Sequence, residues 1–513
     1  MAGISASGNG GHGMTAPTRR EDAGRHFHSP LRDVAPALKQ PRVALIVDHP
    51  SRDLAGLVLT AMELCRRGVT CHLVPLNLMH DQLWTLAPDL VVLNYARPAH
   101  VRIARQLLDA GIKVGVLDTE GAAWESWEAY RELLWTDQAL WHELSFACMW
   151  GPALARQMVS TGLLLDSQVT VTGCPRFDFY HPRWREVFGG NSRPSRPVLL
   201  INTNFSFGNP RFASASRNWE QMQREMGVDA DRLRACLEAE TAALQGMIKL
   251  ARNLARDFSG CDVVLRPHPF EDPSPYLAGL AATPGVTVDG SGPIQSRLFG
   301  ARAIIQRSCS TAAEAAMADV PTLSPQWLPA PALIPFAEAV SISCATYDQL
   351  RLELVRIMDR GGTSDEVAEA RRASLMEWFF RLDGLAHRRV ADTITERLPA
   401  TRTVNMRACT ANLYQLGDPT RSVGQRLGAR VRYALRLSPA WAFRQWRVAD
   451  GEAWRQSDKR FGVDDVAELV RRIRNADVCP APGLERLVVA PARSGNPHGA
   501  PVPSRSVTIR AGA

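Results

Sequence analysis

The chain has 513 residues, of which 45% are hydrophobic and 22% are charged, which is the balance of a soluble globular protein. No apolar stretch reaches the ~18 residues needed to span a bilayer, and residues 1–40 lack the apolar core of a signal peptide. We therefore expect a cytoplasmic protein rather than a secreted or integral-membrane one. At ~150 residues per domain, the length predicts about three structural units.

The net charge of +8 is concentrated at one end of the chain. Residues 401–513 hold 19 basic and 9 acidic side chains, whereas the first 400 residues hold 41 and 43. A nearly neutral main body excludes bulk electrostatic attraction to nucleic acid, so no nucleic-acid partner is expected. The ten cysteines form no CxxC pair, and we interpret them as small buried hydrophobic residues rather than zinc ligands.

The first part of the chain alternates between short apolar runs and helical patterns. The runs lie at 43–47, 71–75, 89–94, 113–117, 146–150 and 168–172, and the helical patterns lie at 54–67, 101–110, 124–140 and 153–160. Buried strands that alternate with helices predict a parallel sheet covered on both faces. We expect a Rossmann-like domain at 41–180, preceded by a disordered segment at 1–40 and followed by a linker at 181–197.

The same alternation restarts at residue 198. Strands are predicted at 198–204, 263–266, 286–288 and 302–306, and helices at 232–258, 294–299 and 311–318. We expect a second Rossmann-like domain at 198–400, closed by a helical stretch at 364–398. Two such domains facing a cleft make the α/β architecture called GT-B, which nucleotide-sugar glycosyltransferases and some epimerases share. A two-domain ligand-binding protein is the alternative, because a fold alone fixes no chemistry.

The C-terminal part has a different composition. Residues 401–479 predict a basic helical appendage, and within it residues 422–455 alternate Arg with apolar residues and with Trp441, Phe443, Trp446 and Trp454. This pattern fits either an ordinary helical subdomain with its arginines in solvent or a segment lying on an anionic membrane surface. Residues 480–513 are rich in Pro, Gly and Arg and are expected to be a disordered tail.

The strongest chemical motif follows the predicted strand 263–266, which runs into Arg266-Pro267-His268-Pro269. A side chain at the carboxyl end of a parallel strand faces the crevice where such sheets bind ligands. Arg266 and His268 can both donate to a phosphate. The structural alternative is a rigid turn whose histidine caps a neighbouring helix.

A second motif, rich in hydroxyl groups, joins a strand to a helix at Ser308, Ser310, Thr311 and Glu314. Thr311 and Glu314 have the spacing of a capping box, and helix N-termini can bind phosphate. We expect these residues, with Asn204 of the second domain's first loop, to hold a donor phosphate. Helix capping alone is the alternative interpretation.

Acidic residues follow two strands of the first domain. Asp118 and Glu120 come after strand 113–117, so either could be the general base that deprotonates an acceptor hydroxyl. The alternative is that Asp118 caps a helix and Glu120 is solvated. Asp48 and Arg52 follow the first strand and could contact an acceptor, although capping by Asp53 explains that segment equally well.

Several other patterns carry no chemistry. Asp229 and Asp231 have the spacing of a metal-binding DxD, but they open a helix and are interpreted as its N-cap. The chain has neither a Walker A sequence nor a GxGxxG after a strand. P-loop NTPase and dinucleotide-dependent redox functions are therefore excluded.

Four separated segments resemble a bacterial family called surface carbohydrate biosynthesis proteins. They are VDHPSRDL at 47–54, LDTEG at 117–121, TGCPRFD at 172–178 and INTNF at 201–205. The resemblance covers roughly residues 41 to 395 and implies a role in the synthesis of capsule or lipopolysaccharide.

A more distant resemblance suggests a mechanism. Bacterial polysialyltransferases and related CMP-sugar enzymes carry an acidic motif before Gly, an HP motif and a Ser-rich motif, which Asp118 to Gly121, His268-Pro269 and Ser308 to Thr311 resemble in type and order. The inserted Thr119 departs from this pattern and leaves open whether Asp118 or Glu120 is the base. CDP-glycerol transferases also carry an RxHP stretch, so the donor stays open. Non-hydrolysing UDP-GlcNAc epimerases share the fold, but their SGGxxEE loop is replaced here by SCSTAAE at 308–314.

The sequence thus predicts a metal-independent glycosyltransferase without cofactor, which passes a sugar from a nucleotide-sugar donor to a glycan or lipid-linked acceptor. In this scheme Glu314 contacts the nucleotide ribose, and the C-terminal part holds the enzyme on the inner face of the membrane. The alternatives are a CDP-glycerol-type polyol-phosphate transferase and a non-catalytic assembly factor that binds nucleotide or glycan.

Overall fold

The computed structural model describes residues 40–122, 124–189, 194–211, 229–361, 364–416, 418, 421–435, 437, 439, 459–477, 487–492 and 505–512. All of them belong to one compact unit that starts at Gln40. The disordered segment predicted at 1–40 lies outside the described residues, except for Gln40 itself.

The first sheet is built on six parallel strands in the order β2-β1-β3-β4-β5-β6. They are β1 (Arg42–Val47), β2 (Thr70–Pro75), β3 (Leu90–Leu93), β4 (Lys113–Leu117), β5 (Phe146–Met149) and β6 (Val169–Val171). Most residues of β1 to β5 are fully buried, as expected where helices cover both faces of a parallel sheet.

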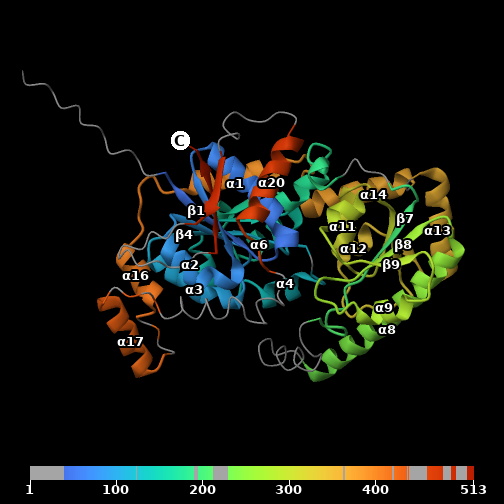
Figure 1. The fold of residues 1–513 in the computed structure, drawn as a ribbon, viewed down its shortest axis with the longest axis horizontal. Coiled ribbons are helices and arrows are strands. Elements are labelled where there is room, and N and C mark those ends of the chain that lie inside the picture. Colours follow the sequence, from blue (N-terminus) through green and yellow to red (C-terminus); the bar gives the residue numbers. More distant parts are fainter. Residues whose placement is uncertain are drawn as a thin grey trace, which may run out of the picture. The chain divides into compact units, whose positions relative to one another are not determined.

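Helices from distant parts of the chain cover this sheet (Figure 1). One face carries α1 (Ala55–Arg66), α15 (Ala386–Arg397) and α20 (Val463–Ala476). The other face carries α2 (Met79–Leu86), α3 (Pro98–Asp109), α6 (Pro152–Ser160) and α16 (Met406–Tyr414). Short turns of 3-10 or π-helix complete this half: η1 (Pro50–Leu54), η2 (Leu76–Leu78), η3 (Asp166–Gln168), η4 (Pro175–Tyr180) and η5 (Arg185–Phe188).

The single helix predicted at 124–140 is wrong, because the chain forms α4 (Trp127–Leu133) and α5 (Gln138–Trp141) there. The backbone of Leu134 is extended, and Trp135 has a φ of 56°, which no helix accommodates. Asp137 then starts α5 by accepting a hydrogen bond from the Leu140 amide at 3.1 Å, as an N-cap residue does.

The second sheet has six parallel strands in the order β12-β11-β10-β7-β8-β9. They are β7 (Val198–Asn202), β8 (Asp262–Arg266), β9 (Val286–Val288), β10 (Ala301–Gln306), β11 (Thr322–Pro325) and β12 (Ile342–Cys344). The accompanying helices are α8 (Ala230–Asp257), α9 (Ser274–Leu280), α10 (Ile294–Leu298), α11 (Thr311–Met317), α12 (Pro335–Ala339), α13 (Tyr347–Arg360) and α14 (Asp365–Phe379). Two Rossmann-like parallel sheets confirm the predicted GT-B-like fold class.

The C-terminal part is helical, as predicted, but α20 packs into the core of the first half and the expected disordered tail contains two strands. Val466, Val470 and Ile473 of α20 are buried in the core of the first half. Within the tail, β13 (Leu487–Pro491) and β14 (Val507–Ala511) extend the first sheet, and β14 pairs antiparallel with β2. Disorder of the tail was predicted from its average composition. That average hides a short run of alternating apolar residues, in which Val507 and Ile509 are fully buried.

No helix among the described residues is long and apolar enough to cross a membrane. Within the same ranges the cysteines are free thiols, and all are buried except the half-buried Cys236. Trp441, Phe443, Trp446 and Trp454 of the predicted membrane segment lie outside the described residues. Its described part forms α17 (Val423–Ala434).

Candidate functional site

A cavity of about 420 Å³ lies between the two sheets. It is lined by the loops that follow β1, β3 and β4 of the first sheet and β7, β8 and β10 of the second. The strand order reverses between β1 and β3 in the first sheet and between β10 and β7 in the second, and open α/β sheets bind ligands at such points. The volume falls within the ~300–1,000 Å³ of small-molecule sites.

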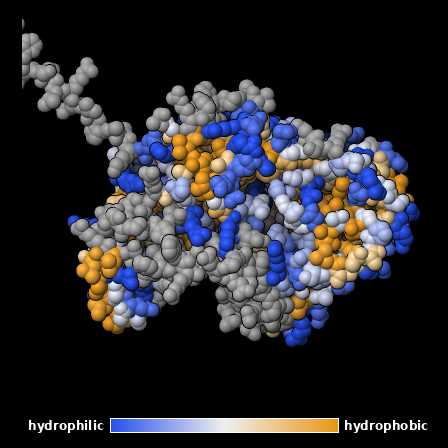
Figure 2. Space-filling model, viewed as in Figure 1, coloured by the Kyte–Doolittle hydropathy of each residue, from blue (hydrophilic) through white to orange (hydrophobic). Residues whose placement is uncertain are grey.

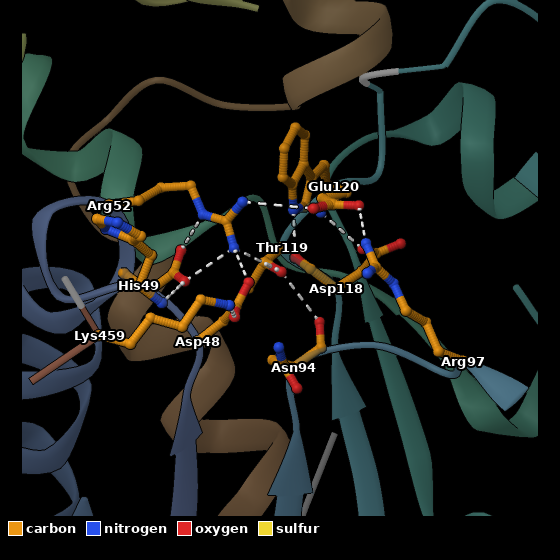
Figure 3. A network of polar contacts seen from close by, with 11 residues as sticks. Asp48, His49, Arg52, Asn94, Arg97, Asp118, Thr119, Glu120 and Lys459 are labelled. Carbon is orange, nitrogen blue, oxygen red and sulfur yellow. Dashed lines mark hydrogen bonds and ion pairs between the residues drawn. The ribbon is translucent and has the colours of Figure 1, made fainter. Parts of the chain in front are cut away.

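Arg52 occupies the centre of the first-sheet side of this cavity (Figure 3). Its guanidinium donates to Asp48 Oδ2 at 2.8 Å and to Asp53 Oδ1 at 2.8 Å, and contacts Glu120 Oε1 at 3.4 Å. Burial lowers the pKa of Arg52, but these carboxylates outweigh it and raise that pKa. Asp53 is therefore an anchor for Arg52, and its side chain does not cap the helix.

Lys459 reaches the same cavity from a part of the chain that the sequence placed in an appendage. Its Nζ donates to Asp48 Oδ1 at 2.6 Å (Figure 3). Burial alone would raise the pKa of Asp48, but Arg52 and Lys459 together lower it to about 2. Asp48 thus stays ionised and holds two cations at the edge of the cavity.

The two acidic residues after β4 have different surroundings. Glu120 lines the cavity, where Oε2 accepts from Arg97 at 2.6 Å. Asp118 is fully buried behind it, accepting hydrogen bonds from the Glu120 amide at 2.8 Å and from the Tyr130 hydroxyl. Burial is the main cause that raises the pKa of Asp118 to about 6. Glu120, and not Asp118, is therefore open to a ligand in the cavity.

Arg266 and His268 both line the cavity at the end of β8. Arg266 donates to the carbonyls of Ser291 at 2.8 Å and Gly292 at 2.6 Å. Some of its N–H groups therefore hold the loop at 291–292 in place. Burial, and then the neighbouring positive charges, lower the pKa of His268 to about 4. Its Nδ1 accepts from the Phe270 amide at 3.2 Å, which leaves the proton of the neutral ring on Nε2 as a donor.

The hydroxyl-rich motif divides into residues inside and outside the cavity. Ser310, Thr311 and Glu314 line it, as does Asn204. Ser308 does not, because its φ is 53° and its Oγ accepts from the Ile334 amide at 2.7 Å. The capping box also does not form: Thr311 is the first helical residue rather than the N-cap, and no side chain caps the helix.

Glu271 is a buried residue that the sequence analysis did not single out. Its Oε1 accepts from Thr203 Oγ1 at 2.8 Å and from the His268 amide at 3.1 Å, and Oε2 accepts from the Tyr276 hydroxyl. It therefore ties the loop after β7 to the loop after β8. No sequence pattern marks it, because its partners come from three different segments.

Some buried polar atoms at the cavity have no hydrogen-bond partner within the described ranges: His49 Nε2, Arg176 Nε, Asn202 Oδ1 and Gln295 Oε1. Buried polar groups in native proteins are almost always paired, so such a group needs an explanation, and a bound ligand is one. Arg176 also lies over the Phe177 ring at 4.5 Å. In the sequence, its segment TGCPRFD at 172–178 drew attention only through the resemblance described above, which gave Arg176 no role.

Comparison with known proteins returned structural similarity alone. No protein-family model and no curated protein matches the chain. A putative UDP-N-acetylglucosamine 2-epimerase from Listeria monocytogenes is 14% identical over 71% of this chain and 98% of its own, with a TM-score of 0.46. The UDP-GlcNAc 2-epimerase from Neisseria meningitidis, bound to UDP-GlcNAc, is 12% identical over 70% and 100%, with a TM-score of 0.45. CalG4, the calicheamicin glycosyltransferase, is 18% identical over 70% and 99%, with a TM-score of 0.40.

Proposed function

We propose that this protein is a glycosyltransferase that moves a sugar from a nucleotide-sugar donor to an acceptor in the synthesis of a surface polysaccharide. One observation carries the proposal. The cavity gathers five cationic side chains from both halves, Arg52, Arg97, Arg176, Arg266 and Lys459, against three carboxylates. A cavity of net positive charge, with unpaired polar atoms in its wall, suits an anionic and hydroxyl-rich ligand such as a nucleotide sugar.

The second half would hold the donor. Arg266 and the Nε2 proton of His268 donate to the phosphates, together with the hydroxyls of Ser310 and Thr311 and the amide of Asn204. Burial is the main cause that raises the pKa of Glu314, so this carboxyl can share a hydrogen bond with the ribose. The neutral His268 contributes a directed hydrogen bond without adding a charge.

The first half would supply the base. Glu120 Oε1 has only a 3.4 Å contact with Arg52, so it keeps a free lone pair for an acceptor hydroxyl. The hydroxyl proton passes to Glu120, the oxygen bonds to the anomeric carbon, and the bond from that carbon to phosphate breaks. The nucleotide leaves with the electron pair, and the cationic side chains stabilise the charge that develops on it.

Substitution of Glu120, with a matched control at Glu132, tests the proposal. In cells that lack the native gene product, Glu120→Gln is expected to abolish the surface polysaccharide, as judged by gel analysis of extracted glycan, because the base is gone. Glu132→Gln, an exposed residue of α4, is the matched control and should restore normal product. Full product from Glu120→Gln would favour a non-catalytic factor, and interconversion of free nucleotide sugars without an acceptor would indicate an epimerase.

We further propose that α17 brings the enzyme to an anionic membrane, where lipid-linked acceptors lie. Val423, Leu427 and Val431 follow one another at four-residue spacing and are 74%, 61% and 48% exposed. Figure 2 shows the apolar patch over this helix. Residues 421–435 contain four arginines and no acidic residue, so the charge of the helix complements anionic lipid.

A further inference from the structure

A second cavity, of about 400 Å³, is lined mainly by the first half of the molecule and is completed by residues of α12 and α14. Gly121 lines this cavity, whereas the preceding residue, Glu120, lines the first one. The loop that follows β4 therefore lines both cavities, and it carries Glu120, the carboxylate that we propose as the base.

The lining of the second cavity combines aromatic rings with polar groups. Trp124, Trp127, Tyr130 and Trp378 contribute the rings, and Ser126 and Gln157 contribute a hydroxyl and an amide. The rings of Trp124 and Trp127 lie 6.0 and 5.7 Å from that of Tyr130. Aromatic faces carry negative charge density and attract the polarised C–H bonds of a pyranose ring, while side-chain hydroxyls and amides pair with sugar hydroxyls.

A hydrogen-bonded connection links this cavity to the first one. Tyr130 lines the second cavity and donates its hydroxyl proton to Asp118, whose other oxygen holds the Glu120 amide at 2.8 Å. Trp135 Nε1 donates to the same tyrosine hydroxyl at 3.0 Å. Asp118 is thus a positioning residue, which sets the place of Glu120 relative to whatever occupies the second cavity.

We propose that the second cavity binds a sugar unit of the acceptor glycan and presents its neighbouring hydroxyl to Glu120. This proposal identifies the acceptor site of the glycosyltransferase proposed above, and it rests on that proposed function. The polar groups in the lining favour a saccharide over a polyprenyl chain, because an apolar chain offers no hydrogen-bond partner to the Gln157 amide or to the hydroxyl proton of Ser126.

Saturation-transfer-difference NMR on the full chain tests the proposal without any nucleotide. The probes are the methyl glycosides of N-acetylglucosamine, N-acetylgalactosamine, galactose, mannose and rhamnose. At least one is expected to receive saturation at its ring C–H protons, and Trp127→Ala should weaken that signal about tenfold. Trp327→Ala is the matched control, because Trp327 is 36% exposed and lines neither cavity, and it should keep the wild-type signal.

Two further variants test the proposal independently of Trp127→Ala. Gln157→Trp fills the cavity from an exposed position, so it should abolish the signal even if Trp127→Ala folds poorly. His268→Ala should leave glycoside binding unchanged, which separates failure of the donor assignment from failure of this one. Any one of three results would overturn the proposal. They are no signal from any glycoside, a signal that survives Gln157→Trp, and a response to geranylgeranyl phosphate alone.

Discussion

Glu271 shows how a single buried carboxylate can fix a site that it does not line. It is 1% exposed and accepts hydrogen bonds from Thr203, His268 and Tyr276. These bonds join the ends of β7 and β8, so the position of the His268 ring depends on a residue three positions further along the chain.

Replacing Glu271 by Ala is expected to destabilise the fold, because three donors lose their acceptor. Each unpaired buried group costs about 1–3 kcal/mol, so a loss of at least about 3 kcal/mol and a clearly lower melting temperature are expected. Glu369→Ala on the exposed side of α14 is the control and should change stability by less than about 0.5 kcal/mol. An unchanged melting temperature of Glu271→Ala would contradict the assigned role.

At this scale most of the residues predicted from the sequence line the cavity, but the orientation of the side chains within each motif was not predictable. Arg266, His268, Glu120 and Arg52 were recognisable because each lies at, or within a few residues of, the carboxyl end of a parallel strand. The choice between Asp118 and Glu120 was not predictable, since it depends on the hydroxyl of Tyr130 twelve residues further on. The contact of Lys459 with Asp48 was not predictable for a similar reason, because no sequence pattern near Lys459 points to Asp48.

At the scale of elements, β14 covers the outer edge of β2. An unpaired strand edge invites association with other chains, and pairing with β14 removes that edge. His72 of β2 lies in this contact, with Nδ1 at 2.9 Å from Thr508 Oγ1. Burial is the main cause that lowers the pKa of His72 to about 4.

This lowered pKa makes stability depend on pH in a defined direction. As pH falls from 6.5 towards 4, the unfolded chain takes up the proton before the folded one does, so the folded state loses stability. The stabilising contribution is complete above the pKa of about 6.5 of an unfolded histidine. The melting temperature is therefore expected to fall further between about pH 7 and about pH 5 in the wild type than in His72→Gln. Parallel curves for the two proteins would contradict this prediction.

Helix α17 yields the membrane prediction. The double variant Leu427→Ser/Val431→Ser should sediment several-fold less with vesicles that contain phosphatidylglycerol, because both apolar contacts with the lipid are lost. Leu277→Ser is the control, since Leu277 is a 52% exposed leucine on α9. Equal sedimentation of the double variant and wild type would exclude α17 as the contact. Deletion of residues 401–513 is unsuitable, because it removes α20 and β14 from the core.

The elements themselves were predictable to different degrees. Strands such as β1 and β4 are short apolar runs, which are typical of a buried parallel sheet when helical patterns separate them, and they form where expected. β11 and β12 escaped prediction because polar residues interrupt their short apolar sequences, TLSP and ISC. The docking of α20 on α1 was not predictable, because it joins residues about 400 positions apart.

At the scale of the molecule, the cavity owes its position to topology. Strand order reverses next to β1 in the first sheet and next to β7 in the second, and the loops after these strands both line the cavity. His49 and Phe270, one from each half, meet with ring centroids 5.8 Å apart. A ligand in the cavity therefore contacts both halves, and we expect its binding to stabilise the whole unit.

The most direct measurement is a thermal-shift panel of the purified full-length chain with UDP, CMP, CDP, GDP and dTDP. A nucleotide at about 100 times its dissociation constant adds about 2.7 kcal/mol of stability to the folded state, which raises the melting temperature. We predict that one of the five does so, that His268→Ala reduces the shift, and that Trp327→Ala leaves it unchanged. No shift with any nucleotide, or a full shift in His268→Ala, would contradict a donor site in this cavity.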